Sequence, residues 1–195
     1  MRAIDERAPA PTKAGFLDLV RRNRVNDVLL QRLPDLNLPQ CYLTAGCLFQ
    51  TAWNWRSGLP PDAMIKDYDV FYFDADDVSW EAEDAIIRRV KATFADIDTT
   101  IEVKNQARVH LWYMQRFGHD YLALRCATEG IDRYLIECTK LGIEVATGAL
   151  YAPNGLEDMW RGVLRANPLN ADEKRFREKA DDYRSRWPWL EIASR

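Results

Sequence analysis

Apolar residues recur at helical spacing near the start of the chain. They follow a period of three to four residues and predict one amphipathic helix over residues 16–32, which ends before Pro34. The repeating positions are Phe16, Leu19, Val20, Val28 and Leu29. The polar, proline-containing stretch before them predicts a flexible N-terminal lead over residues 1–13, followed by a single domain over residues 14–195.

Three short runs further along the chain have the patterns of β-strands. The first, residues 41–44, stops at Ala45–Gly46 and gives way to a helical stretch, in the order strand, tight turn, helix. After a loop over residues 57–66 that holds glycine and two prolines, residues 67–73 are rich in aromatic and β-branched side chains and predict the second strand. Residues 99–104 alternate apolar and polar side chains, which predicts a third strand with one buried face.

A helix is expected between the second and third strands. Ser79 is placed to cap it, its first turn is acidic and its later turns are basic, which matches the helix dipole. Ile87, Val90 and Phe94 form its predicted buried stripe. The rest of the chain is expected to form a polar and aromatic segment to residue 121, a helix near 129–137, a hairpin near 141–150, and helices from about 156 and over 172–187.

These elements predict an α/β or α+β fold, in which a small mixed sheet is flanked by helices and followed by a C-terminal helical portion. The composition, with 47% hydrophobic and 29% charged residues, is that of a globular protein. A net charge of -3 gives no general attraction for a polyanion, so we expect no extended nucleic-acid surface. The absence of a long apolar run and of a signal-peptide pattern favours a cytoplasmic protein that does not enter a membrane, with reduced cysteines.

Two aspartates at the start of the second strand are the strongest candidates for chemistry. Side chains two apart in a strand face the same way, so Asp67 and Asp69 project together and can share one divalent cation. Glu102 points away from Ile101 and Val103 on the third strand and is a candidate third carboxylate. Oxygen ligands suit Mg²⁺, which proteins bind through one or two carboxylates together with substrate phosphates.

Gly46 opens the first helix after a strand, where backbone N–H groups can receive a phosphate. This order of features predicts in-line nucleotidyl transfer at a metal site.

Each of these features also has an ordinary structural explanation. An Asp-x-Asp pair at a strand start is often a turn or capping feature, and any turn from strand to helix can use a glycine such as Gly46. Glu102 on an amphipathic strand can simply face solvent. The sequence order of the set, rather than any one member, favours the catalytic interpretation.

The motifs resemble those of the nucleotidyltransferase superfamily, whose fold is of the polymerase beta-like type. Ala45-Gly46-Cys47, Asp67-Tyr68-Asp69-Val70 and Ile101-Glu102-Val103 stand at the three motif positions. More narrowly, the chain resembles a bacterial family of nucleotidyltransferase-like proteins. That narrower resemblance rests on residues 45–54, 66–74, 102–112, 152–158 and 165–168.

The resemblance implies Mg²⁺ or Mn²⁺ as the metal, a nucleoside triphosphate as substrate and an acceptor that the sequence does not identify. Asp67, Asp69 and Glu102 would be the metal-binding and catalytic residues, and Gly46 with Cys47 would cradle phosphate. Cys47 departs from the superfamily, which has glycine or serine there, because a thiol is a weaker hydrogen-bond donor than a hydroxyl.

Polar residues beside the third acid have two interpretations. Asn105 and Arg108 are candidate nucleotide contacts, since a guanidinium can bind phosphate in bidentate fashion, or they brace the end of the strand. Lys66 neutralises phosphate or pairs with Asp67. Lys179 is assigned to an ordinary charged helix face. The alternative to an enzyme is a catalytically lapsed nucleotide-binding or protein-interaction module, with a toxin-antitoxin partnership as one form of it.

Overall fold

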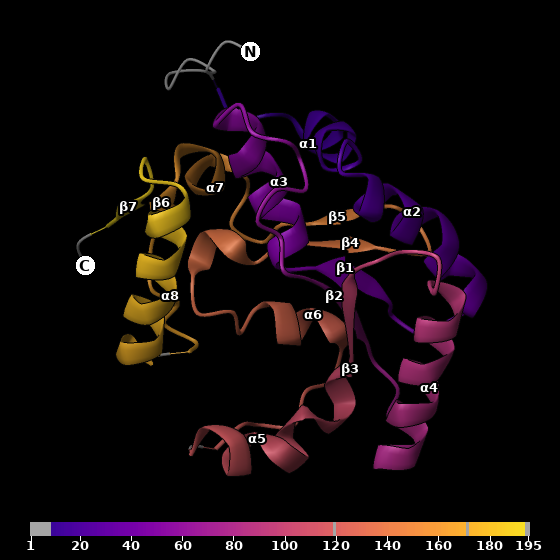
Figure 1. Cartoon of the computed structure of the whole chain (residues 1–195). Coiled ribbons are helices and arrows are strands. Elements are labelled where there is room, and N and C mark those ends of the chain that lie inside the picture. The colour runs from indigo at the N-terminus through magenta and orange to yellow at the C-terminus, as the bar shows by residue number, and fades with distance from the viewer. Residues whose placement is uncertain (1–8, 119, 171, 194–195) are drawn as a thin grey trace.

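The computed structural model describes residues 9–118, 120–170 and 172–193. Its centre is a five-stranded sheet with the order β3-β2-β1-β4-β5, in which only β2 and β3 are parallel. The strands are β1 (Tyr42–Thr44), β2 (Asp67–Tyr72), β3 (Thr100–Asn105), β4 (Gly142–Glu144) and β5 (Leu150–Tyr151). The predicted small mixed sheet with flanking helices is confirmed, and Figure 1 shows the helices arranged around it.

Eight α-helices surround this sheet within the described residues. They are α1 (Lys13–Val20), α2 (Arg24–Arg32), α3 (Gly46–Arg56), α4 (Trp80–Thr93), α5 (Val109–Phe117), α6 (Ala127–Ile131), α7 (Glu157–Arg161) and α8 (Glu173–Arg186). Short 3-10 helices are η1 (Leu33–Leu36), η2 (Gln106–Arg108) and η3 (Glu137–Thr139), and a second sheet pairs β6 (Val163–Leu164) with β7 (Glu191–Ile192). None of the helices in the described ranges is long and apolar enough to cross a membrane.

The N-terminal helical region differs from the prediction of one helix. The structure has α1 and α2 with a break between them, because the side-chain oxygen of Asn23 accepts hydrogen bonds from the backbone N–H groups of Val25 and Asn26, at 3.0 and 3.3 Å, and so caps α2. Residues 1–8 of the expected flexible lead lie outside the described residues. Thr12 caps α1, which already begins at Lys13.

The crossover from β2 through α4 to β3 determines the geometry of the candidate site. Parallel strands need such a connection. Ser79 caps α4 as predicted, and its hydroxyl oxygen accepts a hydrogen bond from the backbone N–H of Ala82. The register pairs Asp69 with Glu102, so these two side chains emerge on the same face of the sheet. Asp67 lies on that face as well, two residues before Asp69.

The segment after β3 departs most from the sequence pattern. The stretch to residue 121 was predicted only as a polar and aromatic segment, and its residues 106–117 form η2 and α5. The helix expected near residues 129–137 is the shorter α6. Figure 1 shows α5 at the end of the molecule away from α1 and α3. The predicted hairpin is confirmed as β4 and β5, and the two C-terminal helices are confirmed as α7 and α8.

The C-terminal segment packs back onto α3. Trp187 is fully buried, its ring centroid lies 5.3 Å from that of Trp53, and its Nε1–H donates to the side-chain oxygen of Asn54 at 3.0 Å. Core packing is therefore the role of these two tryptophans. This packing holds α8 at one side of the sheet and creates the wall of a cavity.

Candidate active site

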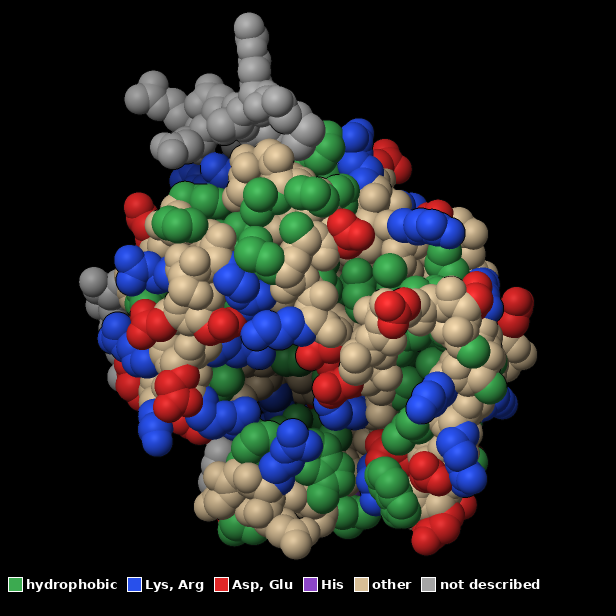
Figure 2. Space-filling model, viewed as in Figure 1, with side chains coloured by type: hydrophobic (Ala, Val, Ile, Leu, Met, Phe, Trp, Pro, Cys, Tyr) green, Lys and Arg blue, Asp and Glu red, His purple; other side chains and the backbone are tan. Residues whose placement is uncertain are grey.

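A cavity of about 490 Å³ lies between the sheet, the start of α3, α5 and α8. Its lining contains four carboxylates and seven basic side chains, so the cavity is positive although the whole chain has a net charge of -3. The acids are Asp67, Asp69, Glu102 and Asp182, and the bases are Lys66, Lys104, Arg116, Arg133, Arg175, Lys179 and Arg186. Figure 2 shows this face of the molecule hollowed, with Lys and Arg side chains gathered around the hollow.

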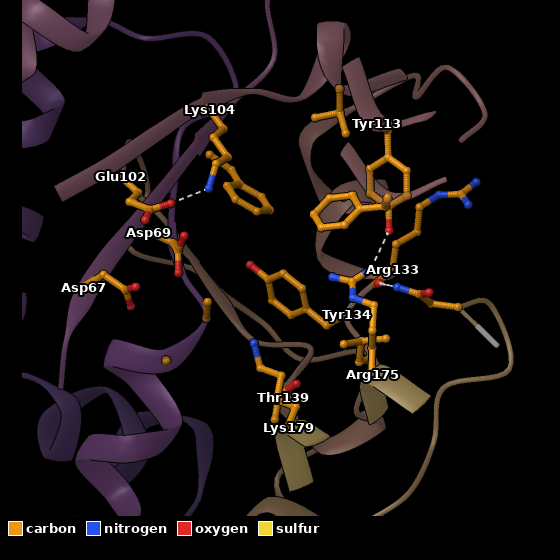
Figure 3. Close-up of a pocket in the computed structure, with 18 of the residues that line it drawn as sticks. Asp67, Asp69, Glu102, Lys104, Tyr113, Arg133, Tyr134, Thr139, Arg175 and Lys179 are labelled. Carbon is orange, nitrogen blue, oxygen red and sulfur yellow. Dashed lines mark hydrogen bonds and ion pairs between the residues drawn. The ribbon is translucent and has the colours of Figure 1, made fainter. Parts of the chain in front are cut away.

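The acidic wall of the cavity comes from two neighbouring strands. Asp67 and Asp69 alternate along β2 with Tyr68 and Val70, which are buried in the core behind the sheet. Because Asp69 is paired in register with Glu102 of β3, all three carboxyl groups lie on the cavity side (Figure 3). The predicted shared face of these acids is present.

The environment of Asp69 disfavours its negative charge. Burial raises the pKa of this carboxyl group to about 6, and the charges of Asp67 and Glu102 add to the rise, while Lys104 opposes it. A cation placed between Asp67 and Asp69 would relieve the repulsion between them. The two oxygen donors therefore fit a divalent metal ion.

Glu102 is engaged with Lys104. The Lys104 ammonium donates to the Glu102 carboxylate, and this hydrogen bond lowers the pKa of Glu102. Across the described residues, no three His, Cys, Asp or Glu side chains are close enough together to hold a metal ion. Glu102 is instead paired with Lys104, and its part in a metal site stays a prediction.

The turn from β1 into α3 is strained. Ala45 has a φ of 63° and a ψ of -138°, a conformation that only glycine adopts easily. A Cβ atom on Gly46 would lie 2.4 Å from the side-chain nitrogen of Gln50. The side-chain oxygen of Gln50 accepts a hydrogen bond from Arg186 at 3.1 Å. Ala45 and Gly46 both line the cavity, so the start of α3 faces the space in front of the acids.

Cys47 does not face the cavity. Its side chain is fully buried and its Sγ–H donates to the backbone oxygen of Thr44 at 3.2 Å. Burial raises the pKa of the Cys47 thiol well above its ordinary value. The first turn of α3 directs the thiol into the core, so the predicted phosphate cradle at Gly46 and Cys47 would depend on the backbone N–H groups and not on the thiol.

Asn105 and Arg108 do not line the cavity, contrary to their interpretation as nucleotide contacts. Arg108 forms a buried ion pair with Glu83 of α4, and its Nε–H donates to the backbone oxygen of Val78 at 3.2 Å. The side chain of Asn105 exchanges two hydrogen bonds with the backbone of Asp74, at 2.8 and 3.0 Å. Both residues brace the end of β3 against the segment that leads into α4. Lys66, in contrast, does line the cavity, and it forms no ion pair with Asp67.

The basic wall of the cavity, which includes Arg175, Lys179 and Arg186 of α8, faces the acids. Lys179 points from α8 into the cavity toward Asp69 (Figure 3). The surrounding protein lowers the pKa of Lys179 by removing its ammonium group from water, whereas Asp69 and Asp67 favour the charged form. Tyr134 lies between the two walls, and its hydroxyl is 3.0 Å from the hydroxyl of Thr44.

The family model for nucleotidyltransferases matches residues 31–192. The chain belongs to the nucleotidyltransferase family. A search of curated proteins found no match. Two solved structures are similar to this nucleotidyltransferase chain, and both likenesses show the fold.

The first similar structure is an NMR structure that reveals a CCA-adding enzyme head domain. It has 22% sequence identity and a TM-score of 0.74, and the match covers 99% of each chain. The second is a CCA-adding enzyme in complex with ATP, with 13% identity and a TM-score of 0.51. That match covers 94% of this chain and 42% of the other.

The sequence pattern missed the basic wall of this nucleotidyltransferase chain. Lys179, which was assigned to an ordinary charged helix face, lines the cavity together with Arg175, Asp182 and Arg186. These four residues share one face of α8, at spacings of four, three and four residues. The spacing was readable in the sequence, but the identity of the surface that this face would meet was not.

Proposed function

We propose that this chain transfers a nucleoside monophosphate from a nucleoside triphosphate to an acceptor that carries a hydroxyl or phosphate group. The observation that carries the proposal is the cavity itself, in which a carboxylate pair, Asp67 and Asp69, faces an excess of positive charge. An acceptor oxygen would lose its proton and bond to the α-phosphorus, and the bond from that phosphorus to the pyrophosphate group would break.

The triphosphate would bind between the two walls. Lys179 and Lys66 line the cavity and form no ion pair within the described part of the chain, so their ammonium groups are available to phosphate oxygens. The N-terminal end of α3 at Gly46 adds N–H groups and the positive end of a helix dipole. The ATP complex of the similar CCA-adding enzyme supports a nucleoside triphosphate as the ligand.

Asp67 and Asp69 would hold the divalent cation, Mg²⁺ or Mn²⁺, together with phosphate oxygens. When bound, such a cation neutralises charge on the triphosphate and on the departing pyrophosphate. We assign Glu102 to the orientation of Lys104 rather than to proton abstraction, because the lowered pKa of Glu102 makes it a weak base. Asn105 and Arg108 are left out of the proposed site.

Calorimetric titration of each nucleoside triphosphate, in Mg²⁺ and in EDTA, tests the binding step. We expect Asp67→Asn and Asp69→Asn to remove the Mg²⁺-dependent part of binding. Lys179→Gln is expected to weaken binding by roughly 10- to 100-fold, because a hydrogen bond to a charged group is lost. Lys174→Gln is the matched control, since Lys174 lies on the same helix with its side chain 85% exposed and outside the cavity lining.

A transfer screen tests the chemistry. An α-labelled triphosphate incubated with tRNA, protein and small-molecule acceptors should label one class with the wild type and none with Asp69→Asn. Failure of every triphosphate to bind in Mg²⁺ would contradict the proposal. Binding by the wild type without transfer to any acceptor would favour the nucleotide-binding module that has lost catalysis.

A further inference from the structure

Aromatic side chains gather at the end of the cavity away from the carboxylates. Tyr113 and Phe117 come from α5, and Tyr121 comes from the loop that follows it. The ring centroid of Tyr113 lies 4.6 Å from that of Phe117 and 4.3 Å from that of Tyr121. All three rings line the cavity, so this cluster is not part of the core behind the sheet.

Two guanidinium groups complete this end of the cavity. The guanidinium carbon of Arg175 lies 4.2 Å from the ring centroid of Phe117, and that of Arg133 lies 4.8 Å from the ring centroid of Tyr121. Both arginines line the cavity. We name the set of Tyr113, Phe117, Tyr121, Arg133 and Arg175 the aromatic box.

Arg133 is held in place without neutralisation of its charge. The side-chain nitrogen of Asn170 donates to the backbone oxygen of Arg133 at 2.7 Å, which links the α6–η3 segment to the start of the α8 region. Within the described ranges, Arg133 forms no ion pair with a carboxylate. Arg175 is restrained by Tyr113, whose hydroxyl oxygen accepts its hydrogen bond at 3.3 Å. Arg133 therefore presents a planar cation with an anchored backbone and no carboxylate partner among the described residues, whereas Arg175 also lies 3.9 Å from a carboxylate oxygen of Asp172.

The position of the box relative to the acids determines what it can bind. Figure 3 shows Arg133, Arg175 and Tyr113 on one side of the cavity and Asp67 and Asp69 on the other, with Tyr134 and Lys179 between them. A ligand whose phosphates meet Lys179 and the carboxylate-bound cation would direct its remaining part toward the box. Flat rings and guanidinium planes bind flat, polar, aromatic groups by stacking, and guanidinium donors also meet ring nitrogens and carbonyl oxygens.

We propose that the aromatic box is the binding site for the base of the nucleoside triphosphate. This inference rests on the proposed function, because it places the base of the same substrate whose phosphates lie at Lys179. The base stacks on the guanidinium and ring faces of the box, and the unused N–H donors of Arg133 meet its polar edge.

Inorganic tripolyphosphate has the phosphates of the substrate but no base, so its binding can be compared with that of a nucleoside triphosphate. The wild type should bind a nucleoside triphosphate more tightly than tripolyphosphate, both measured by calorimetry in Mg²⁺. Arg133→Lys keeps the positive charge but loses the planar group, and Tyr121→Ala removes a half-buried ring. Each variant should bind the nucleotide roughly 10- to 100-fold more weakly and bind tripolyphosphate as the wild type does.

Arg125→Lys is the matched control, since the side chain of Arg125 is 88% exposed and lies outside the cavity lining. Its affinity for both ligands should be that of the wild type. Unchanged nucleotide affinity in Arg133→Lys and Tyr121→Ala would overturn the box while leaving the proposed function intact. A wild type that binds neither ligand would overturn both proposals, and equal binding of the two ligands by the wild type would overturn the box alone.

Discussion

At the scale of single residues, Asp69 determines much of the electrostatics of the cavity. Burial raises its pKa from the ordinary value of 3.8 to about 6. The native state therefore holds a proton on Asp69 at pH values where the unfolded chain has already lost it. The stability that comes from this proton is fully present below pH 3.8 and is lost as the pH rises through 6.

Asp69→Asn should stabilise the metal-free protein at neutral pH. The amide has a similar shape but no charge, so the free energy of unfolding at pH 8 in EDTA should rise by about 1 to 3 kcal/mol. At pH 4 the aspartate is protonated in the native state, and the two proteins should have similar stability. Urea denaturation at both pH values measures this difference. A variant less stable than the wild type at pH 8 would contradict the expectation that the buried negative charge of Asp69 destabilises the metal-free protein.

At the scale of elements, a buried ion pair joins α4 to the end of β3. Arg108 pairs with Glu83, whose other carboxylate oxygen accepts a hydrogen bond from the backbone N–H of Asn105 at 2.8 Å. Glu83 therefore contacts both η2 and β3 from the first turn of α4. This joint ties the end of β3 to α4.

Arg108→Met should destabilise the fold without changing the cavity. Loss of one partner leaves a buried carboxylate unpaired, which costs about 3 to 5 kcal/mol in the free energy of unfolding. The double variant with Glu83→Gln should recover part of that loss, since both charges are then absent. Chemical denaturation measures both effects. A normal free energy of unfolding combined with weaker nucleotide binding in Arg108→Met would instead indicate a phosphate contact.

At the scale of the whole molecule, the cavity exists because the C-terminal segment returns to the N-terminal half. Trp187 packs on Trp53 and bonds to Asn54, and the ring of Tyr183 lies 5.5 Å from that of Phe49. These contacts place α8, with its basic face, opposite the acids of β2. The two walls of the cavity thus belong to segments about 110 residues apart in the sequence.

Trp187→Ala should loosen α8 and impair both stability and binding. Removal of a fully buried tryptophan is expected to lower the free energy of unfolding by about 3 to 5 kcal/mol. Nucleotide affinity should fall in the same variant, because α8 carries Lys179. Trp80→Ala is the control, since Trp80 is 54% exposed and its loss should cost less than about 1 kcal/mol. Urea denaturation followed by circular dichroism, with calorimetry below the unfolding transition, measures both quantities.

Local sequence pattern was sufficient to predict the acidic wall. The period of two along β2 and β3 determines that Asp67, Asp69 and Glu102 leave the sheet on the face opposite their buried neighbours. Gly46 at the start of α3 likewise marks the turn at which the chain changes from strand to helix. Such features depend on neighbours within a few residues, so they can be predicted without knowledge of the fold.

Tertiary structure alone decided which surfaces meet. Cys47 lies in one of the nucleotidyltransferase-like motifs and Arg108 in the polar stretch after the third acid, but the fold directs the thiol into the core and the guanidinium into a buried ion pair with Glu83. Helical spacing places Lys179 on one face of α8, but nothing local shows what that face or Arg133 contacts, and both residues reach the cavity only because distant segments fold together. Local periodicity determines the face on which a side chain lies, whereas long-range packing determines what that face contacts.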